Sequence, residues 1–454
     1  MKFGVFFTVV LALLFFDLLS SHPAEAQYAA PPAPDRSDIE KAYDAAFRTM
    51  FEDPGDLDKS FAFALLAIRL GDYEGAIATL ERMLLIDPEL PRVKMELGVL
   101  YFRLKSYQVA KGYLEQVRDD PKAPDLVKSR VAEFLEAIDD QTSPHRFRGS
   151  VFAGLRHQSN ANAGPASGKV RVLGLDADLD STFTDQADVD QFVSARLLHF
   201  YDYGVEPRIQ LENEVVGYLS NQVTQDQLDT SILQFRSGPR FTMDPDFLRG
   251  LDIRPFVRAD IVNLEDSRYY TSYGAGFDGN YVISSETGLF FETYMTRRNY
   301  NNTATYPTNK EELNGPRGYG GVTVSHILSS NTRMSFTGAV TRDSSDAAGR
   351  RYWRYEGSAS VTRIFESPLP EHTGPWSLSA IGKLAAVPYD EPLDSIDPDV
   401  TRDDTEWQVQ LVGSVRVRDN VSLVASGLFK QVDSTISNYE YDNWAFSMGV
   451  AVQF

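Results

Sequence analysis

The chain has 454 residues, which predicts two or more domains. Its net charge of −20 argues against a nucleic-acid surface, because phosphate binding needs clustered Lys and Arg. The chain contains no Cys, which excludes disulfides, Cys-ligated zinc, thiol catalysis and a lipid-modified N-terminal Cys.

Residues 1–26 have the pattern of a secretory signal peptide. A positive Lys2 precedes an apolar stretch over residues 3–19, and Ala24 and Ala26 form an A-x-A cleavage pattern. The alternative is a membrane-anchor helix, but the stretch is short and carries an aspartate. After it, no run of about eighteen apolar residues occurs, so we expect no transmembrane helix in the mature chain.

Residues 27–37 are rich in Pro and Ala and predict an extended linker, and residues 38–143 then follow a helical period. Matching residues recur 34 positions apart, which resembles the tetratricopeptide repeat, a helix-turn-helix unit of that length. The residues that define the repeat are Tyr73, Ala76, Leu80, Leu97, Gly98, Tyr101, Tyr107, Ala110 and Leu114.

The repeat region has room for about two full units, with a half-unit at 38–50 before them and a closing helix at 124–138 after them. Such stacked units present a concave face, so we expect a groove that holds a peptide or a partner protein. A spacer or assembly domain is the alternative.

From residue 144 to 454 the apolar period becomes two. Val257, Ala259 and Ile261, for example, alternate with Arg258 and Asp260. One face therefore needs hydrocarbon and the other needs water, and most stretches have about eleven to fifteen residues, the length of a tilted strand that crosses a bilayer. We predict fourteen strands, which begin near residues 148, 188, 207, 230, 251, 268, 286, 314, 332, 351, 375, 405, 421 and 443.

The connections support a bacterial outer-membrane barrel of about fourteen antiparallel strands. The odd-numbered gaps include the long ones, and the even-numbered gaps are mostly tight, as expected for outer loops and periplasmic turns. The third gap, read at "EDSR", is short and departs from this rule. An even strand number places both ends of the barrel, and with them the helical domain, in the periplasm.

The last strand alternates bulky apolar residues with small or polar ones and ends on an aromatic. We expect the first set to face lipid while the strand closes the barrel against the first strand. A terminal aromatic also resembles the signal read by the barrel assembly machinery; a soluble sandwich edge strand is the alternative. These residues are Trp444, Phe446, Met448, Val450, Val452 and Phe454.

No catalytic or metal site is predicted. The six His form no metal-binding pair, and no nucleophile elbow or phosphate loop occurs. The acidic stretch 394–404 is either solvated or bridged by a divalent ion to lipopolysaccharide. We therefore expect no enzyme, cofactor or resident metal, and a hydrated lumen with charged residues on its wall. The predicted lumen residues are Glu212, Glu214, Arg258, Asp260, Arg416 and Arg418.

The stretch "GLRHQSNANAGP" follows the first strand. Together with repeats before it and a barrel after it, it resembles the surface lipoprotein assembly modulators over nearly the whole mature chain. The positions that match the family are Arg156, Gln158, Ser159, Asn160, Ala161 and Asn162.

The resemblance implies an outer-membrane translocator of a Gram-negative bacterium. Its periplasmic repeats would bind a cargo protein, and its barrel would pass the cargo to the surface. The implied cargo is a lipoprotein with a small β-barrel domain for iron or haem capture, or an unlipidated protein as in type XI secretion. Other partners are the barrel assembly machinery, lipid and lipopolysaccharide. An exopolysaccharide exporter is the main alternative, and a nutrient porin with an accessory domain is a third.

Overall fold

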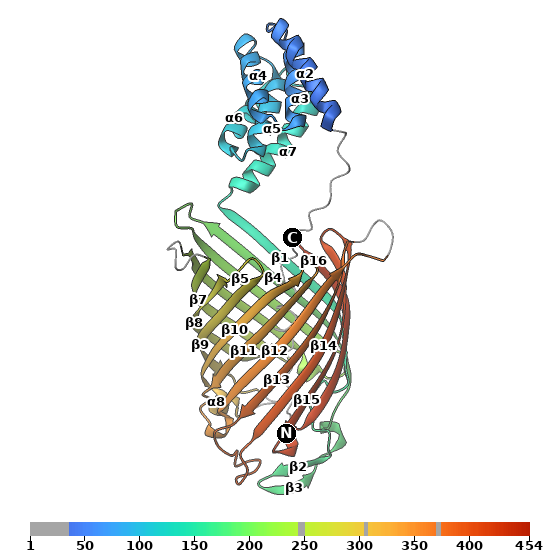
Figure 1. Ribbon diagram of the computed structural model, residues 1–454. Coiled ribbons are helices and arrows are strands. Elements are labelled where there is room, and N and C mark those ends of the chain that lie inside the picture. The colour runs from blue at the N-terminus through green and yellow to red at the C-terminus, as the bar shows by residue number, and fades with distance from the viewer. Residues whose placement is uncertain (1–35, 244–249, 304–306, 369–373) are drawn as a thin grey trace. The chain divides into compact units, whose positions relative to one another are not determined.

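The computed structural model describes residues 36–243, 250–303, 307–368 and 374–454. Its contacts divide the chain into two compact units, with the boundary between Ser143 and Pro144 (Figure 1). The predicted signal peptide and most of the predicted linker lie outside the described residues. The linker prediction extends two residues too far, because a helix already begins at Arg36.

The unit before Pro144 consists of helices with short connections. Two helix pairs, α3–α4 and α5–α6, are preceded by α2 and followed by α7, as the 34-residue period predicts. The helices are α2 (Arg36–Glu52), α3 (Leu57–Leu70), α4 (Tyr73–Ile86), α5 (Pro91–Arg103), α6 (Tyr107–Asp119) and α7 (Asp125–Thr142). No helix in the described ranges is both long and apolar enough to span a membrane.

The turns of the helical unit follow from its capping residues. The Asp56 side chain accepts hydrogen bonds from the first backbone N–H groups of α3. Gly71 ends that helix in the left-handed conformation at φ +90°, which a glycine adopts without a steric cost. Asp72 then caps α4 directly, so the two helices turn back on each other within two residues.

The repeat-defining residues lie at helix crossings. Ala76, Leu80, Leu97, Ala110 and Leu114 are 0% exposed. Gly98 is placed so that a Cβ there would lie 2.6 Å from the Leu114 side chain, so α5 and α6 approach as closely as a glycine allows. Two apolar clusters result, one around α3 and α4 and the other around α6 and α7. Tyr73 packs at the edge of the first cluster, and Tyr101 lies at the edges of both. Tyr107 packs at the edge of the second.

The second unit is a closed antiparallel barrel of fourteen strands, as predicted, and its strands run obliquely around it (Figure 1). Each strand pairs with its neighbour in sequence, and β1 pairs with β16. The strands are β1 (His145–Gln158), β4 (Asp188–Asp202), β5 (Ile209–Gln222), β6 (Thr230–Thr242), β7 (Leu251–Leu264), β8 (Ser267–Val282), β9 (Thr287–Tyr300), β10 (Gly315–Ser329), β11 (Thr332–Asp343), β12 (Tyr352–Phe365), β13 (Trp376–Pro388), β14 (Asp403–Arg418), β15 (Val421–Ser434) and β16 (Tyr441–Gln453).

The seam between β1 and β16 closes the barrel. It runs from the pair Ser150–Gln453 to the pair Gln158–Ala445. The Phe454 backbone extends it by exchanging hydrogen bonds of 2.7 and 2.9 Å with Gly149. A Cβ at Gly149 would lie 2.3 Å from the Phe454 ring, so the terminal aromatic covers a glycine of the first strand.

The two faces of the wall differ as the period of two predicts. On β16, the side chains of Trp444, Phe446 and Met448 are 51, 57 and 67% exposed, whereas Ala445 and Ser447 are buried. Val450, Val452 and Phe454 continue the outward row. The same apolar outward row recurs on the other strands, for example at Val257, Phe336, Leu384 and Leu411. A continuous apolar belt of this kind needs a hydrocarbon surrounding.

Odd-numbered connections lie at one end of the barrel, called here the long-connection end, and even-numbered ones lie at the short-turn end. The start of β1 and the end of β16 both lie at the short-turn end. The short gap at "EDSR" is the fifth connection rather than the third. Glu265 and Asp266 form it as a two-residue hairpin turn with φ of 47° and 56°.

The sequence did not predict the short elements in the long connections. The first connection contains a small hairpin of β2 (Lys169–Val172) and β3 (Leu175–Asp178), and the seventh contains the short helix α8 (Asn309–Leu313). Strands of four residues are too short for an alternating pattern to stand out in the sequence.

The close approach at Gly98 gives the first prediction. We expect Gly98→Ala to destabilise the helical unit by about 1–3 kcal/mol, because the buried Leu114 side chain would have to move. The measurement is thermal unfolding of the full chain in detergent, followed by the helical circular dichroism signal. Gly112→Ala in α6 is the control; a Cβ there meets nothing within 4 Å, so this variant should gain up to about 1 kcal/mol. Equal behaviour of the two variants would contradict the packing argument.

Candidate functional site

The motif after the first strand begins with an ion pair inside the barrel wall. Arg156 donates from Nε and Nη2 to both Asp190 carboxylate oxygens at 2.8 and 2.9 Å, and from Nη2 to the Tyr218 hydroxyl at 3.1 Å. Arg156 is 3% exposed and Asp190 is 0% exposed. The bidentate geometry joins β1, β4 and β5 on the interior face.

The rest of the motif shapes the first connection. Asn160 receives a backbone N–H from Gly164 and donates its amide to the Gly164 carbonyl, both at 2.9 Å. The Asn162 side chain binds Thr184 and Gln186 in the same way, at 2.8 and 2.9 Å. The returning chain is thereby fixed against the beginning of the loop.

The same motif also fastens the seam. Asn443 on β16 accepts the backbone N–H of Asn160 at 3.0 Å, and Ser159 accepts the N–H of Trp444 at 2.9 Å. Ala161 is buried and donates its N–H to the Gln186 carbonyl at 2.7 Å. Gln158 is buried beside Asp190. The motif residues therefore meet other parts of the barrel, and apart from Ser159 and Asn162 they are almost fully covered.

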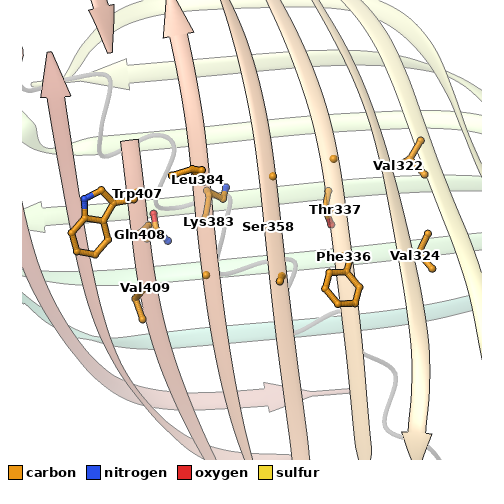
Figure 2. A pocket seen from close by; sticks show the side chains of 14 residues that line it. Val322, Val324, Phe336, Thr337, Ser358, Lys383, Leu384, Trp407, Gln408 and Val409 are labelled. Carbon is orange, nitrogen blue, oxygen red and sulfur yellow. The ribbon is translucent and has the colours of Figure 1, made fainter. Parts of the chain in front are cut away.

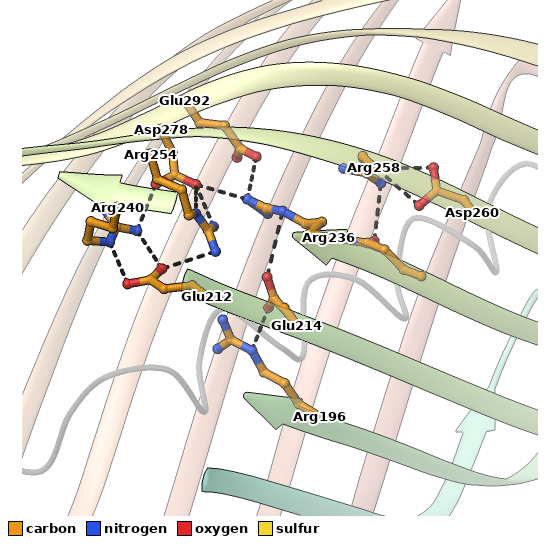
Figure 3. Close-up of polar contacts among 11 residues, drawn as sticks. Arg196, Glu212, Glu214, Arg236, Arg240, Arg254, Arg258, Asp260, Asp278 and Glu292 are labelled. Atoms are coloured by element: carbon orange, nitrogen blue, oxygen red, sulfur yellow. Dashed lines mark hydrogen bonds and ion pairs between the residues drawn. The ribbon is translucent and has the colours of Figure 1, made fainter. Parts of the chain in front are cut away.

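A network of arginines and carboxylates covers the interior wall from β4 to β9 (Figure 3). Arg236 lies between Glu214 at 3.6 Å and Glu292 at 2.9 Å. Asp278 is fully buried and contacts Arg254 at 2.5 Å and Arg240 at 2.9 Å. The pairs extend to Arg196–Glu214, Arg240–Glu212, Arg254–Glu212 and Arg258–Asp260.

The network is electrically balanced. Its five cations are Arg196, Arg236, Arg240, Arg254 and Arg258, and its five anions are Glu212, Glu214, Asp260, Asp278 and Glu292. Each member has at least one partner of opposite charge within 4 Å. Pairing of this kind is needed on a wall where side chains cover one another, because an unpaired buried charge costs several kcal/mol.

Four of the six predicted lumen residues belong to this network: Glu212, Glu214, Arg258 and Asp260. Arg416 lies against Gly374 near the short-turn end. The prediction for Arg418 is wrong, because the register of β14 shifts between Arg416 and Arg418 and leaves Arg418 exposed at the turn. The arginine partners on β4, β6 and β7 were not predicted, although the same alternation marks their interior face.

A second ion-pair cluster lies on β12 to β15, where three cations share two carboxylates. Arg354 binds Glu406 at 2.8 Å and Glu356 at 3.1 Å. Lys383 pairs with Glu356 and Lys430 pairs with Glu406, at 2.8 and 3.0 Å. Salt-bridged side chains therefore occur on two separate groups of strands, β4 to β9 and β12 to β15.

The long connections are tied to one another. Arg171 on β2 binds Asp397 of the eleventh connection at 2.8 Å, and this ion pair holds the pKa of the Asp397 carboxyl below its ordinary value. The Asn438 amide of the thirteenth connection exchanges hydrogen bonds of 2.6 and 2.9 Å with the Arg171 backbone. Arg350 and Glu312 join the ninth and seventh connections at 2.8 Å.

An apolar recess of about 860 Å³ lies on the wall from β10 to β14 (Figure 2). Gly338, Gly357 and Gly382 leave its floor without side chains, and Phe336 and Leu384 stand beside it. Its exposed residues belong to the outward apolar row. The recess is therefore a shallow depression in the membrane-facing surface, where glycines carry no side chain, and not a polar ligand site.

The helical unit has an aromatic and cationic pair between its two repeats. The Arg92 guanidinium of α5 lies 4.8 Å from the centre of the Phe61 ring of α3. Tyr101 stacks on Tyr113 and donates its hydroxyl to Glu81 at 2.9 Å. Burial first, and the carboxylate second, raise the pKa of Tyr101 to about 12.

The fold and the wall define a barrel-forming outer-membrane protein with a helical repeat domain. No family model matches the chain, and no curated protein matches it.

Several solved structures match between 23% and 30% of the chain. The Yersinia enterocolitica type III secretion chaperone SycD, in complex with a peptide of the translocator YopD, is 16% identical over 30% of this chain and 95% of its own, with a TM-score of 0.22. PcrH in complex with the chaperone-binding region of PopD is 15% identical over 30% of this chain and 90% of its own, with a TM-score of 0.22. MamA is 19% identical over 23% of this chain and 60% of its own, with a TM-score of 0.21.

The buried pair in the first strand gives a second prediction. Arg156→Met leaves Asp190 charged and without its partner, so we expect the barrel to lose about 3–5 kcal/mol of stability. The measurement is the temperature at which the folded band is lost in heat-modifiability gels. Arg148→Met is the matched control, because Arg148 is exposed on the same strand and its guanidinium lies 5.8 Å from the centre of the Phe200 ring. A similar loss in both variants would show that the pair has no special role.

The Tyr101 hydroxyl gives a third prediction. Because its folded pKa is raised, its contribution to stability is present below the ordinary tyrosine value of about 10 and is lost as the pH rises through about 12. The difference in tyrosinate absorbance between the wild type and Tyr101→Phe should therefore titrate near 12. Glu81→Gln should move this midpoint down while leaving it above 10, since burial remains. A midpoint near 10 in the wild type would contradict the assignment.

Proposed function

We propose that the chain is an outer-membrane translocator, similar to the surface lipoprotein assembly modulators. It binds a cargo protein through its helical repeats and delivers the cargo to the cell surface or medium, through or along its barrel. The observation that carries this proposal is the charge-balanced network on the interior wall from β4 to β9. We expect no enzymatic activity.

A network with equal numbers of positive and negative charges suits the passage of a polypeptide. An unfolded or partly folded protein carries both signs of charge, and a wall of tightly paired arginines and carboxylates neither holds nor repels one sign over long distances. A conduit for one charged polymer would need an excess of the opposite charge. The network from β4 to β9 has no such excess.

The repeats supply the binding step. Stacked helix pairs present a face that accepts an extended or helical peptide, and Arg92 with Phe61 offers a cation and an aromatic ring on neighbouring units. We place this unit in the periplasm, because the barrel begins and ends at the short-turn end, which faces the periplasm in bacterial barrels. The predicted signal peptide and the terminal Phe454 fit export and insertion by the barrel assembly machinery.

The cargo is a secreted or lipidated protein, in this proposal one with a small β-barrel domain for iron or haem acquisition. Its folding outside the cell would supply the energy, since the periplasm has no ATP and the sequence has no nucleotide motif. Pulse-chase of cargo exposure with a folding-defective cargo tests this step, and undiminished export would rule it out.

An exopolysaccharide exporter is the second candidate. Interior tyrosines gather toward the long-connection end, and flat rings of this kind stack on sugars. They include Tyr270, Tyr294, Tyr300, Tyr319 and Tyr352.

Deletion followed by surface proteomics distinguishes the two candidates and is the fourth prediction. We expect one specific protein to disappear from the surface or medium while polysaccharide is unchanged. Complementation with Arg92→Glu should restore the barrel but deliver several-fold less cargo, because the substitution reverses the charge beside Phe61. Arg118→Glu on α6 is the control and should restore delivery. Loss of polysaccharide with all surface proteins retained would reject the translocator.

A further inference from the structure

One cluster on the interior wall leaves an arginine outside its ion pair. Near the long-connection end, Arg298 on β9 donates from Nη2 to both Asp343 oxygens at 2.6 Å. Arg317 on β10 is the direct cross-strand neighbour of Asp343 on β11, but no carboxylate of the described residues lies within ion-pair distance of it. Two guanidinium groups therefore share one carboxylate, and the cluster carries an excess of one positive charge.

The hydrogen-bonding capacity of this cluster is incomplete. The Nε atoms of Arg298 and Arg317 are both buried and have no hydrogen-bond partner in the described ranges of the chain. Arg298 as a whole is 3% exposed. A buried donor without an acceptor costs about 1–3 kcal/mol, so two such donors in one cluster call for an acceptor that the described residues do not provide.

The neighbouring carboxylates are already engaged. Asp343 also accepts the Ser345 hydroxyl at 2.7 Å, and Glu312 on α8 is bound by Arg350. Asp260 is held by Arg258 and Ser272. None of these groups is free to neutralise Arg317.

Tyrosines border the cluster. Arg298 donates from Nη1 to the Tyr300 hydroxyl at 3.1 Å, and the Tyr300 ring lies 4.9 Å from that of Tyr270. Tyr352 is the cross-strand neighbour of Asp343 on the other side. Rings and hydroxyls thus flank the two guanidinium groups on the interior face.

We propose that Arg298 and Arg317 form an oxyanion-binding site on the interior wall of the barrel. Guanidinium groups match carboxylate, sulfate and phosphate through paired N–H donors, and an anion there would neutralise the excess charge and accept the two free Nε–H groups. The ligand is either a free oxyanion or an acidic group carried by a chain in transit. The site does not depend on which cargo the barrel carries, so it goes beyond the proposed function.

Binding of sulfate to the purified full chain in detergent tests the site and is the fifth prediction. Thermal unfolding is measured in sodium sulfate and in sodium chloride at equal ionic strength. Sulfate should raise the unfolding temperature of the wild type, and Arg317→Gln should weaken the apparent affinity by about ten-fold or more, as expected for a lost charge-assisted pair. Arg297→Gln is the matched control, since it removes the same charge from an exposed residue of β9 that faces the other side of the wall. It should keep the wild-type response.

Two further arms complete the test. Arg317→Lys keeps the charge and the stem but lacks the Nε donor, so it should bind sulfate several-fold more weakly even if Arg317→Gln does not assemble. A short glutamate-rich peptide replaces sulfate in the second arm; stabilisation by the peptide but not by sulfate would assign the site to a chain in transit. No anion-specific shift in the wild type with either probe, or an equal shift in the Arg317 variants, would overturn the proposal.

Discussion

Closure of the wall between β1 and β16 is the constraint on which the rest of the barrel depends. Hydrocarbon offers no partner for a backbone N–H or C=O, so a sheet in a bilayer has to leave no open edge. Here the last residue contributes, because the Phe454 backbone pairs with Gly149 and its ring covers the glycine. The Ser159 and Asn160 contacts to β16 fasten the other end of the same seam.

Once the wall is closed, the charged side chains on its interior face need partners of opposite charge. The strands bring many charged side chains together, and their mutual covering makes any unpaired charge costly. On the wall from β4 to β9, arginines and carboxylates neutralise one another in ion pairs. Arg156 and Asp190 form such a pair between β1 and β4. Against that background, the Arg317 side chain is informative, because its Nε atom is buried and has no hydrogen-bond partner among the described residues.

The helical unit obeys a different rule. Its stability comes from close crossing of short helices, which requires small residues at fixed places in each repeat, such as Gly98 against Leu114. The two units are thus stabilised in different ways: helix packing within repeats stabilises one, and closure of the sheet into a barrel stabilises the other. Their combination in one chain is the basis of the translocator function proposed above.

The sequence by itself determined what local periodicity encodes. A period of 34 with Ala76 and Ala110 predicted the helix pairs, and a period of two predicted fourteen strands with starts within three residues of those observed. The interior position of Glu212 and Asp260 followed from the same alternation. Only the tertiary structure decided which residues meet across strands. The pairing of Arg236 with Glu292, the bulge that exposes Arg418 and the lone position of Arg317 depend on register and closure, which are set by contacts between residues far apart in the chain and leave no local pattern.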